Sequence, residues 1–453
     1  MHLYNTLTRK VEQFTNLAKP ASHVSLYCCG PTVYDFTHIG HLRKYTMDDV
    51  LRRALTYTGY EVKHVMNITD VGHLVSDGDT GEDKMETGAK KYGKTVWEVA
   101  QMYTDFFTRS MKEMNVLMPT VVCKATDHIP GMIKMIEQLE KNGYTYQTGE
   151  AVYFDTSKFN EYEELSGQKQ DEKKSAVRAE VVEDTNKKSP ADFALWFLRV
   201  GKFADHAMHW DSPWGDGFPG WHIECSAMSR EYLGDQIDIH TGGIDHVPVH
   251  HTNEIAQSEA ATGKHPFVKY WVHHNFLTVE GTKMSKSLGK FLTIDDIVEK
   301  GVDPMALRLL FLQTHYRNEM NFTWVALEAA QTAYTRFIRR LREVGEADPT
   351  LDTEFATAID NDLDTSVALS VLLKVKNPDQ AFKMDRVLGL GIQSTLTIVE
   401  EIPADIVELT QKRFVAKQQK DYATADSIRV QIESKGYKLL DTKEGSRAVK
   451  GRN

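Results

Sequence analysis

Two short polar strings stand far apart in the sequence, and both carry side chains that suit phosphate groups. The first is His38-Ile39-Gly40-His41, and the second is Lys283-Met284-Ser285-Lys286-Ser287. Imidazole N–H groups donate to phosphate oxygens, and lysines neutralise the charge that develops during transfer at phosphorus. Either string alone occurs by chance, and the second could be an exposed basic loop. Together and in this order, they indicate a split site that activates ATP.

A second set of residues could bind a metal ion. Cys29, Cys225, His250 and Glu254 offer thiol, imidazole and carboxylate donors, which zinc accepts. His250 and Glu254 are one turn apart in a segment with helical periodicity, so they share a face of the predicted helix. The spacing does not by itself bring Cys29 near Cys225, and a single Cys is commonly a small buried core residue. A zinc site and ordinary core packing therefore both stay open.

The elements around the first string form a βαβ unit. The apolar run from His23 to Cys29 predicts a strand, and Met47 to Leu55 shows helical periodicity. Gly59 suits the end of this helix, and Glu61 to Ile68 predicts the next strand. His38 to His41 would then lie at a strand-to-helix turn, where parallel α/β folds bind phosphates.

Later segments of the chain indicate secondary structure but are less specific for a function. Asn67 to Asp70 ends the second strand, where it could contact a ligand or cap a helix. Gln236 to His240 predicts a strand, with Thr241-Gly242-Gly243 as the turn after it. Ala326 to Val344 and Glu354 to Val375 have helical periodicity, which is consistent with a helical bundle. The final residues, including Arg447, Lys450 and Arg452, are basic, and we expect them to be mobile.

Composition limits the class of protein. The 453 residues are enough for more than one domain, and the net charge of −10 argues against a general polyanion binder. Any contact with nucleic acid must therefore come from local basic patches. The sequence has no apolar run of membrane-spanning length, no signal-peptide profile, and four cysteines that do not suggest a disulfide framework. We expect a cytoplasmic protein without membrane association.

The sequence closely resembles the cysteinyl-tRNA synthetases, a family of class I aminoacyl-tRNA synthetases, over nearly its whole length. The segments that carry the resemblance are Cys29 to Asp35, His38 to His41, Asn67 to Asp70, Ser212 to Gly215, Gly220 to Met228, Asp238 to His240, Gly242-Gly243, His250 to Gln257 and Lys283 to Gly289. The resemblance implies an α/β fold: a doubly wound Rossmann-type catalytic domain split by an insertion, then an α-helical bundle and a small α+β C-terminal domain.

The expected domains follow from this resemblance and from changes of pattern along the chain. They are the first half of the Rossmann domain (1–118), the connective insertion (119–206), the second half of the Rossmann domain (207–280), the stem-contact region with the lysine string (281–320), the helical bundle (321–402) and the anticodon-binding domain (403–453).

The resemblance also implies site residues. Cys29, Cys225, His250 and Glu254 match the positions that bind one zinc ion per chain, which the substrate thiolate joins. Zinc binds a thiolate far better than a hydroxyl, so it can select cysteine over serine where pocket shape cannot. Thr69, Trp221 and His240 match positions of the amino-acid pocket, with packing or capping as their alternative roles. His38, His41, Lys283 and Lys286 match catalytic positions, of which His38, His41 and Lys286 bind ATP, with Mg²⁺ accompanying it.

The implied reaction activates L-cysteine with ATP and transfers it to cysteine tRNA, and we expect a monomer. Asp127 and the segment Val247 to Val249 depart from the family pattern, so neither receives a role. One alternative is a paralogous ligase that passes cysteine to an amino-sugar acceptor and lacks a full anticodon-binding terminus. Another is a non-catalytic RNA-binding relative, which would be expected to lose histidines or lysines of the split site. Cysteine-dependent ATP–pyrophosphate exchange, followed by tRNA charging, separates these possibilities.

Overall fold

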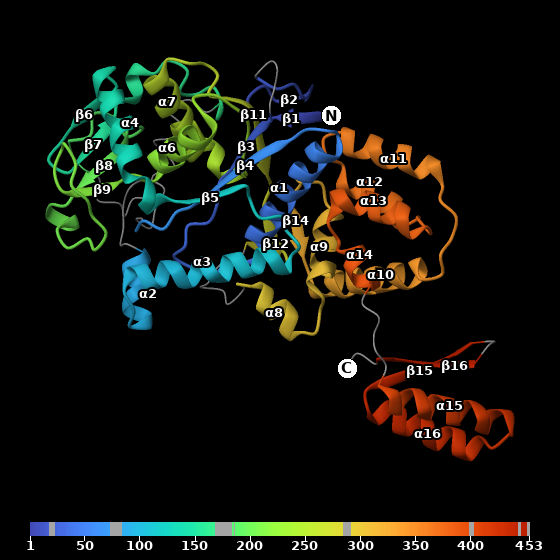
Figure 1. Cartoon of the computed structure of the whole chain (residues 1–453). Helices are drawn as coiled ribbons and strands as arrows, with labels where there is room; N and C mark the ends of the chain where they lie inside the picture. The colour runs from blue at the N-terminus through green and yellow to red at the C-terminus, as the bar shows by residue number, and fades with distance from the viewer. Residues whose placement is uncertain are drawn as a thin grey trace. The chain divides into compact units, whose positions relative to one another are not determined.

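The structure is a computed structural model that describes residues 1–17, 23–72, 84–167, 184, 186–283, 291–397, 403–442 and 445–450. The chain forms two units, Met1–Ile392 and Gln393–Asn453. Figure 1 shows a central sheet with helices around it in the first unit, and a helix pair with a hairpin in the second. Within the described residues, no helix is long and apolar enough to cross a membrane.

Five parallel strands form the central sheet in the order β11-β10-β3-β4-β5. Their bounds are β3 Val24–Cys28, β4 Val62–Ile68, β5 Val121–Lys124, β10 Ile237–Gly243 and β11 Val268–His274. Every residue of β3 is buried, as expected for a central parallel strand covered on both faces. The chain leaves β3 toward β4 on one side, while β10 pairs with its other side. The carboxyl ends of β3 and β10 therefore flank a topological switch point, where α/β sheets bind ligands.

Two groups of helices pack around this sheet. The first group contains α1 (Ile39–Tyr57), which contacts α3 (Val96–Glu113), α9 (Pro304–Leu312) and α13 (Pro378–Leu388). The second group is α4 (Ile129–Lys141), α6 (Trp221–Leu233) and α7 (Thr252–Thr262).

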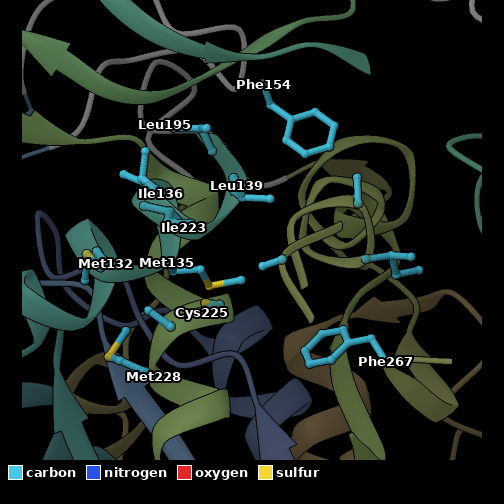
Figure 2. Packing of buried hydrophobic residues seen from close by; sticks show 14 of the residues in the cluster. Met132, Met135, Ile136, Leu139, Phe154, Leu195, Ile223, Cys225, Met228 and Phe267 are labelled. Atoms are coloured by element: carbon cyan, nitrogen blue, oxygen red, sulfur yellow. The ribbon is translucent and has the colours of Figure 1, made fainter. Parts of the chain in front are cut away.

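The second group contributes to a hydrophobic cluster in which Cys225 lies next to Met135, with Ile136, Leu139 and Ile223 further along the same cluster (Figure 2). This packing holds α6, and with it Cys225, in a fixed position.

The insertion has its own antiparallel sheet, ordered β6-β7-β8-β9. Its strands are Thr145–Gln147, Ala151–Phe154, Phe193–Leu198 and Gly217–Pro219. The central sheet thus extends beyond the expected boundary at residue 118, since β5 follows it, and the insertion sheet extends beyond residue 206. Both differences arise because strand pairing, rather than composition, decides to which sheet a segment belongs.

The remaining elements complete the first unit and form the second. In the first unit they are β1 His2–Asn5, β2 Lys10–Gln13, α2 Lys84–Tyr92, β12 Leu277–Val279, β13 Thr282–Lys283, α8 Ile294–Glu299, β14 Met320–Phe322, α10 Trp324–Leu341, α11 Pro349–Asp360 and α12 Thr365–Leu372. The helix α14 (Ile392–Thr397) begins where the two units meet in the sequence. The second unit contains α15 Ala404–Gln418, α16 Tyr422–Ser434, β15 Tyr437–Thr442 and β16 Gly445–Lys450.

The helical periodicity of Glu354 to Val375 is confirmed, and this range spans α11 and α12. The two helices are separated where Asp362 and Leu363 adopt positive φ values of 53° and 54°, after which Asp364 caps α12. Two other local predictions were wrong. Thr241-Gly242-Gly243 continues β10, since these residues pair with β11. Gly445–Lys450 of the basic terminus pairs with β15 as a hairpin strand. Arg452 lies outside the described residues.

A buried arginine joins the helices of the first unit. The Arg308 side chain donates to Asp49 Oδ2 at 2.5 Å, to Met114 O at 2.9 Å and to Leu388 O at 2.7 Å. Arg308 and Asp49 are both fully buried. These hydrogen bonds therefore tie α9 to α1, to the segment that follows α3 and to the C-terminus of α13.

Replacing Arg308 by methionine leaves the Asp49 carboxylate buried without this partner. Breaking a buried pair costs about 3–5 kcal/mol, so we expect a large drop in the free energy of unfolding, measured in urea. Arg109→Met is the control, because Arg109 pairs with Asp295 on the surface, where both side chains are more than two-fifths exposed. It should cost less than about 1 kcal/mol. Equal losses for the two variants would contradict this account.

Candidate active site

One cavity of about 720 Å³ connects the two predicted groups of site residues. It lies at the carboxyl ends of β3, β4, β10 and β11, and its wall includes the start of α1. Cys29, Cys225 and His250 line it, as do His38 and His41. A small molecule bound here can therefore contact the cysteine–histidine group and the α1 terminus at once.

His38 and His41 form a stacked pair at the N-terminus of α1. Their ring centroids are 3.6 Å apart, with 12° between the ring planes. The His41 backbone N–H donates to His38 Nδ1 at 3.2 Å, and the His38 backbone N–H donates to His41 Nδ1 at 3.5 Å. Because each Nδ1 accepts a hydrogen bond, each neutral ring carries its proton on Nε2.

Burial lowers the pKa of His38 to about 4, so this ring is neutral at pH 7. The helix N-terminus therefore presents two neutral N–H donors and its own partial positive charge, which together suit phosphate oxygens.

The segment after the lysine string is fixed against these histidines. Phe291 meets the His38 ring edge-on at 5.1 Å, and the Ile39 N–H donates to Leu292 O at 2.9 Å. Thr293 forms an isolated bridge with His38. On the other side of the string, the backbone of Lys283 belongs to β13 and pairs with Thr278. Lys286 lies outside the described residues, so its role stays a prediction.

The structure brings Cys29, Cys225, His250 and Glu254 together. One potential ligand atom from each lies within 4.8 Å of the others, and all four residues are buried. Cys29 Sγ is 4.0 Å from Glu254 Oε1, which is 3.0 Å from His250 Nε2. Gly30, the residue after Cys29, allows the chain to pass close to β4. A Cβ at this position would lie only 1.7 Å from Asn67 O, so only glycine fits here.

The charges of this cluster suit a divalent cation. Burial raises the pKa of the Cys29 thiol, whose hydrogen bond to Cys225 lowers the pKa of Cys225 to about 6. Burial alone would raise the pKa of Glu254, but His240 and His250 lower it to about 2. Burial alone would lower the pKa of His250, but Glu254 and Cys225 raise it to about 10. The cluster thus gathers negative donor atoms, and metal binding would displace protons from it.

A second group of possible ligands shares two members with the first: Cys29, His240, His251 and Glu254. His240 Nε2 is 3.0 Å from Glu254 Oε2, and His251 Nε2 is 3.4 Å from Cys29 Sγ. Cys225 and His250 line the cavity, whereas His240 and His251 are not among the described residues that line it. A ligand entering through the cavity therefore reaches the first group, and His240 and His251 contact its members from behind.

The other nitrogen of His250 also has a partner. His222 Nδ1 lies 2.9 Å from His250 Nδ1, and both side chains are buried. Metal-binding histidines are commonly held in this way, with one ring nitrogen fixed and the other facing the metal. His250 lies in a π-helical turn, Val247–His251, that leads into α7. Val247 to Val249, the segment whose sequence departs from the family pattern, therefore forms part of the turn that carries His250.

The three residues predicted for the amino-acid pocket lie close to the cluster. Trp221 lines the cavity, and its ring is 4.3 Å from that of His250. Thr69 also lines the cavity and donates to Glu224 Oε2 at 2.8 Å. His240 is fully buried behind the cavity wall and contacts Glu254.

Asp70, the neighbour of Thr69, contacts the segment that follows β5. Its carboxylate accepts hydrogen bonds from the backbone N–H and the hydroxyl of Thr126, at 2.9 and 2.8 Å.

Sequence reasoning missed Lys44. This side chain lines the cavity, donates to Cys29 O at 2.5 Å and pairs with Asp48 at 2.8 Å. Burial alone would lower its pKa, but Asp48 raises it, so Lys44 is a cation beside the cluster. Lys44 is three residues after His41 and shares its helix face, so the helical period was the signal that could have found it.

Comparison with known proteins gives the class. Residues 15–332 match the model of the tRNA synthetases class I (C) catalytic domain. The methionyl-tRNA synthetase of Mycobacterium tuberculosis, solved with methionyl-adenylate, is 13% identical, with a TM-score of 0.56 over 85% of this chain and 87% of that one. A leucyl-tRNA synthetase of Agrobacterium radiobacter K84, in a ternary complex with tRNA, is 14% identical, with a TM-score of 0.56 over 86% and 87%. The predicted class I α/β fold is therefore confirmed.

Curated relatives match the chain almost from end to end. Cysteine–tRNA ligase 1 of Burkholderia lata is 44% identical over 98% of this chain and 96% of its own length. The cysteine–tRNA ligase of Treponema denticola is 42% identical over 97% and 98%, and that of Thermus thermophilus 40% over 98% and 98%. The chain belongs to the cysteine–tRNA ligase family.

Proposed function

We propose that this enzyme activates L-cysteine with ATP and transfers it to the terminal adenosine of cysteine tRNA. The observation that carries the proposal is the single cavity that contains both the Cys29–Cys225–His250 wall and the α1 N-terminus. A cysteine whose side chain contacts that wall can direct its carboxylate toward an ATP phosphate held at His38 and His41. Holding two reactants in this way supplies much of the rate for such a transfer. Cysteine-dependent ATP–pyrophosphate exchange tests the first step, and tRNA charging tests the second.

Zinc is the metal that the four-residue cluster suits best, because two thiols, an imidazole and a carboxylate match its preferences. Cys29, Cys225, His250 and Glu254 would hold it, and the ion would bind the substrate side chain as a thiolate. The buried histidines around them, His222 and His240, would fix the orientation of His250 and Glu254. Serine would then be rejected by its weak affinity for the metal, without an editing site.

The split site would position ATP and neutralise its charge. The Nε2–H groups of His38 and His41 would donate to phosphate oxygens, and Lys283 and Lys286 would offset the negative charge that develops in the transition state. Magnesium would accompany ATP. Trp221 and Thr69 would line the amino-acid pocket beside His250. A monomeric state and a cytoplasmic location stay predictions from the sequence.

Replacing Lys286 by alanine should lower the rate of adenylate formation by roughly 100-fold, since a charge complementary to the transition state is removed. Cysteine-dependent ATP–pyrophosphate exchange measures the effect. The zinc content should not change, because the metal ligands come from other segments. A twofold effect on exchange would rule out the assigned role of Lys286.

A further inference from the structure

An exposed group of three lysines and a tryptophan occupies the junction of α2 and α3. Lys90 and Lys91 are in the last turn of α2, Lys94 precedes the cap of α3, and Trp97 is in its first turn. All four side chains are exposed, and Trp97 is 50% exposed. We call these residues the lysine–tryptophan patch. Such a local basic group stands out in a chain whose net charge is −10.

Two acidic side chains of the described residues of α2 and α3, Glu86 and Glu98, lie near the patch. The Glu98 carboxylate accepts from the backbone N–H and the hydroxyl of Thr95, at 2.8 and 2.9 Å, in the capping box of α3. Glu86 accepts from the backbone N–H of Ala207 at 2.9 Å. Both carboxylates keep their negative charge, and the three lysines of the patch outnumber them, so the local charge that a phosphate would meet is positive.

Trp97 lies outside the buried face of α3 and packs against the insertion. Its ring meets that of Trp210 edge-on, with centroids 6.4 Å apart and 89° between the planes. Half of the indole surface stays in contact with solvent. An exposed indole of this kind is a stacking surface for a nucleobase.

The elements that carry Trp97 and Trp210 both reach residues that line the active-site cavity. On α3, Tyr103 packs against Phe36, which lines the cavity, and six residues of helix place Trp97 about 9 Å further along the axis. In the insertion, the backbone of Trp210 pairs with Gly217, and the next residue, Phe218, lines the cavity. Trp97 is thus connected to the cavity wall through α3 and Phe36, and Trp210 is connected to it through Gly217 and Phe218.

We propose that the lysine–tryptophan patch binds the unpaired 3′ nucleotides of tRNA as they enter the cavity. The inference rests on the proposed function, which requires the 3′ terminal adenosine to reach the activated cysteine. Lysines attract phosphates in any nucleic acid, but only unpaired nucleotides can offer a base face to Trp97. The patch thus favours a single strand over the paired acceptor stem.

A double-mutant cycle between the protein and the tRNA tests this interaction. Trp97→Ala should weaken the binding of intact cysteine tRNA about tenfold, a typical effect of losing one stacked base, and Trp97→Phe should restore most of it. The same substitution should have no effect on a tRNA that lacks its unpaired 3′ nucleotides. An equal effect on intact and shortened tRNA would overturn the proposal, since Trp97 would then act elsewhere on the tRNA or only on the fold.

The salt dependence of tRNA binding tests whether the lysines of the patch neutralise phosphates. The double variant Lys90→Ala/Lys94→Ala should reduce the slope of log affinity against log salt for intact tRNA by about 0.7 for each phosphate that the variant no longer neutralises. Lys134→Ala/Lys141→Ala, which removes two exposed lysines from α4, is the matched control and should leave the slope unchanged. Equal slopes for the two double variants would overturn the role of the lysines.

Cysteine-dependent ATP–pyrophosphate exchange distinguishes failure of this proposal from failure of the proposed function. All patch variants should catalyse exchange at the wild-type rate, because the first step does not involve tRNA. If the unmodified enzyme catalyses no exchange, the proposed function is wrong. If exchange is normal and the tRNA cycle shows no coupling, only the patch proposal is wrong.

Discussion

Replacing Cys29 by serine should remove most of the zinc and reduce cysteine activation by at least about 100-fold. Cys29 contributes one of two thiols in a cluster whose ligand atoms all lie within 4.8 Å, and a hydroxyl is a much weaker ligand. Loss of even an outer-shell partner can cost about 10–100-fold, so loss of a direct ligand should exceed that. Elemental analysis of the purified protein measures the metal, with one zinc per chain expected for the unmodified enzyme.

Cys28→Ser is the matched control, because it makes the same change at the adjacent position. Cys28 is the buried last residue of β3, and the charged side chains that act on it are Asp48, Lys44 and Arg52 of α1. This variant should keep its zinc. The reverse pattern, with zinc lost in Cys28→Ser and retained in Cys29→Ser, would show that the wrong cysteine was chosen. Less than half a zinc in the unmodified protein after metal-replete expression would contradict the metal site itself.

Local sequence patterns predicted the elements around His38 and His41 well. An apolar run, a helical repeat opened by His38 to His41 and a second apolar run identified β3, α1 and β4 to within a residue or two. These signals are short-range, because strand and helix periods are set by neighbouring residues. The position of the two histidines at the first turn of α1 follows from the same local rules.

The metal cluster could not be assembled by such rules. Cys29 follows β3, Cys225 is on α6, and His250 and Glu254 flank the start of α7. They meet because β10 pairs with β3 and because α6 and α7 pack together, and both are long-range events that leave no periodic signal. The resemblance to a family supplied the grouping that the residues alone left open. The roles of His240 and His251 behind the cluster likewise depend on which face of β10 and of the π-helical turn meets it.

Ending the chain after Glu401 should separate the two chemical steps. This change removes α15, α16 and the terminal hairpin, which pack around their own small core of Ile406, Ile428 and Ile432. The cavity and the metal cluster belong entirely to the first unit, Met1–Ile392. Cysteine-dependent ATP–pyrophosphate exchange should therefore stay within a few-fold of the rate of the intact enzyme.

Charging of cysteine tRNA by the shortened enzyme should fall by on the order of 100-fold in kcat/KM, which corresponds to about 3 kcal/mol of transition-state stabilisation. The reason is that the proposed anticodon-binding segment contributes binding energy to tRNA and none to the first step. Substituting the anticodon bases should weaken charging by the intact enzyme but have little further effect on the shortened one. Equal charging by both proteins would refute anticodon binding by this segment while leaving the two-step reaction in place. Normal exchange without tRNA charging by either protein would instead favour the paralogous ligase that transfers cysteine to a small acceptor.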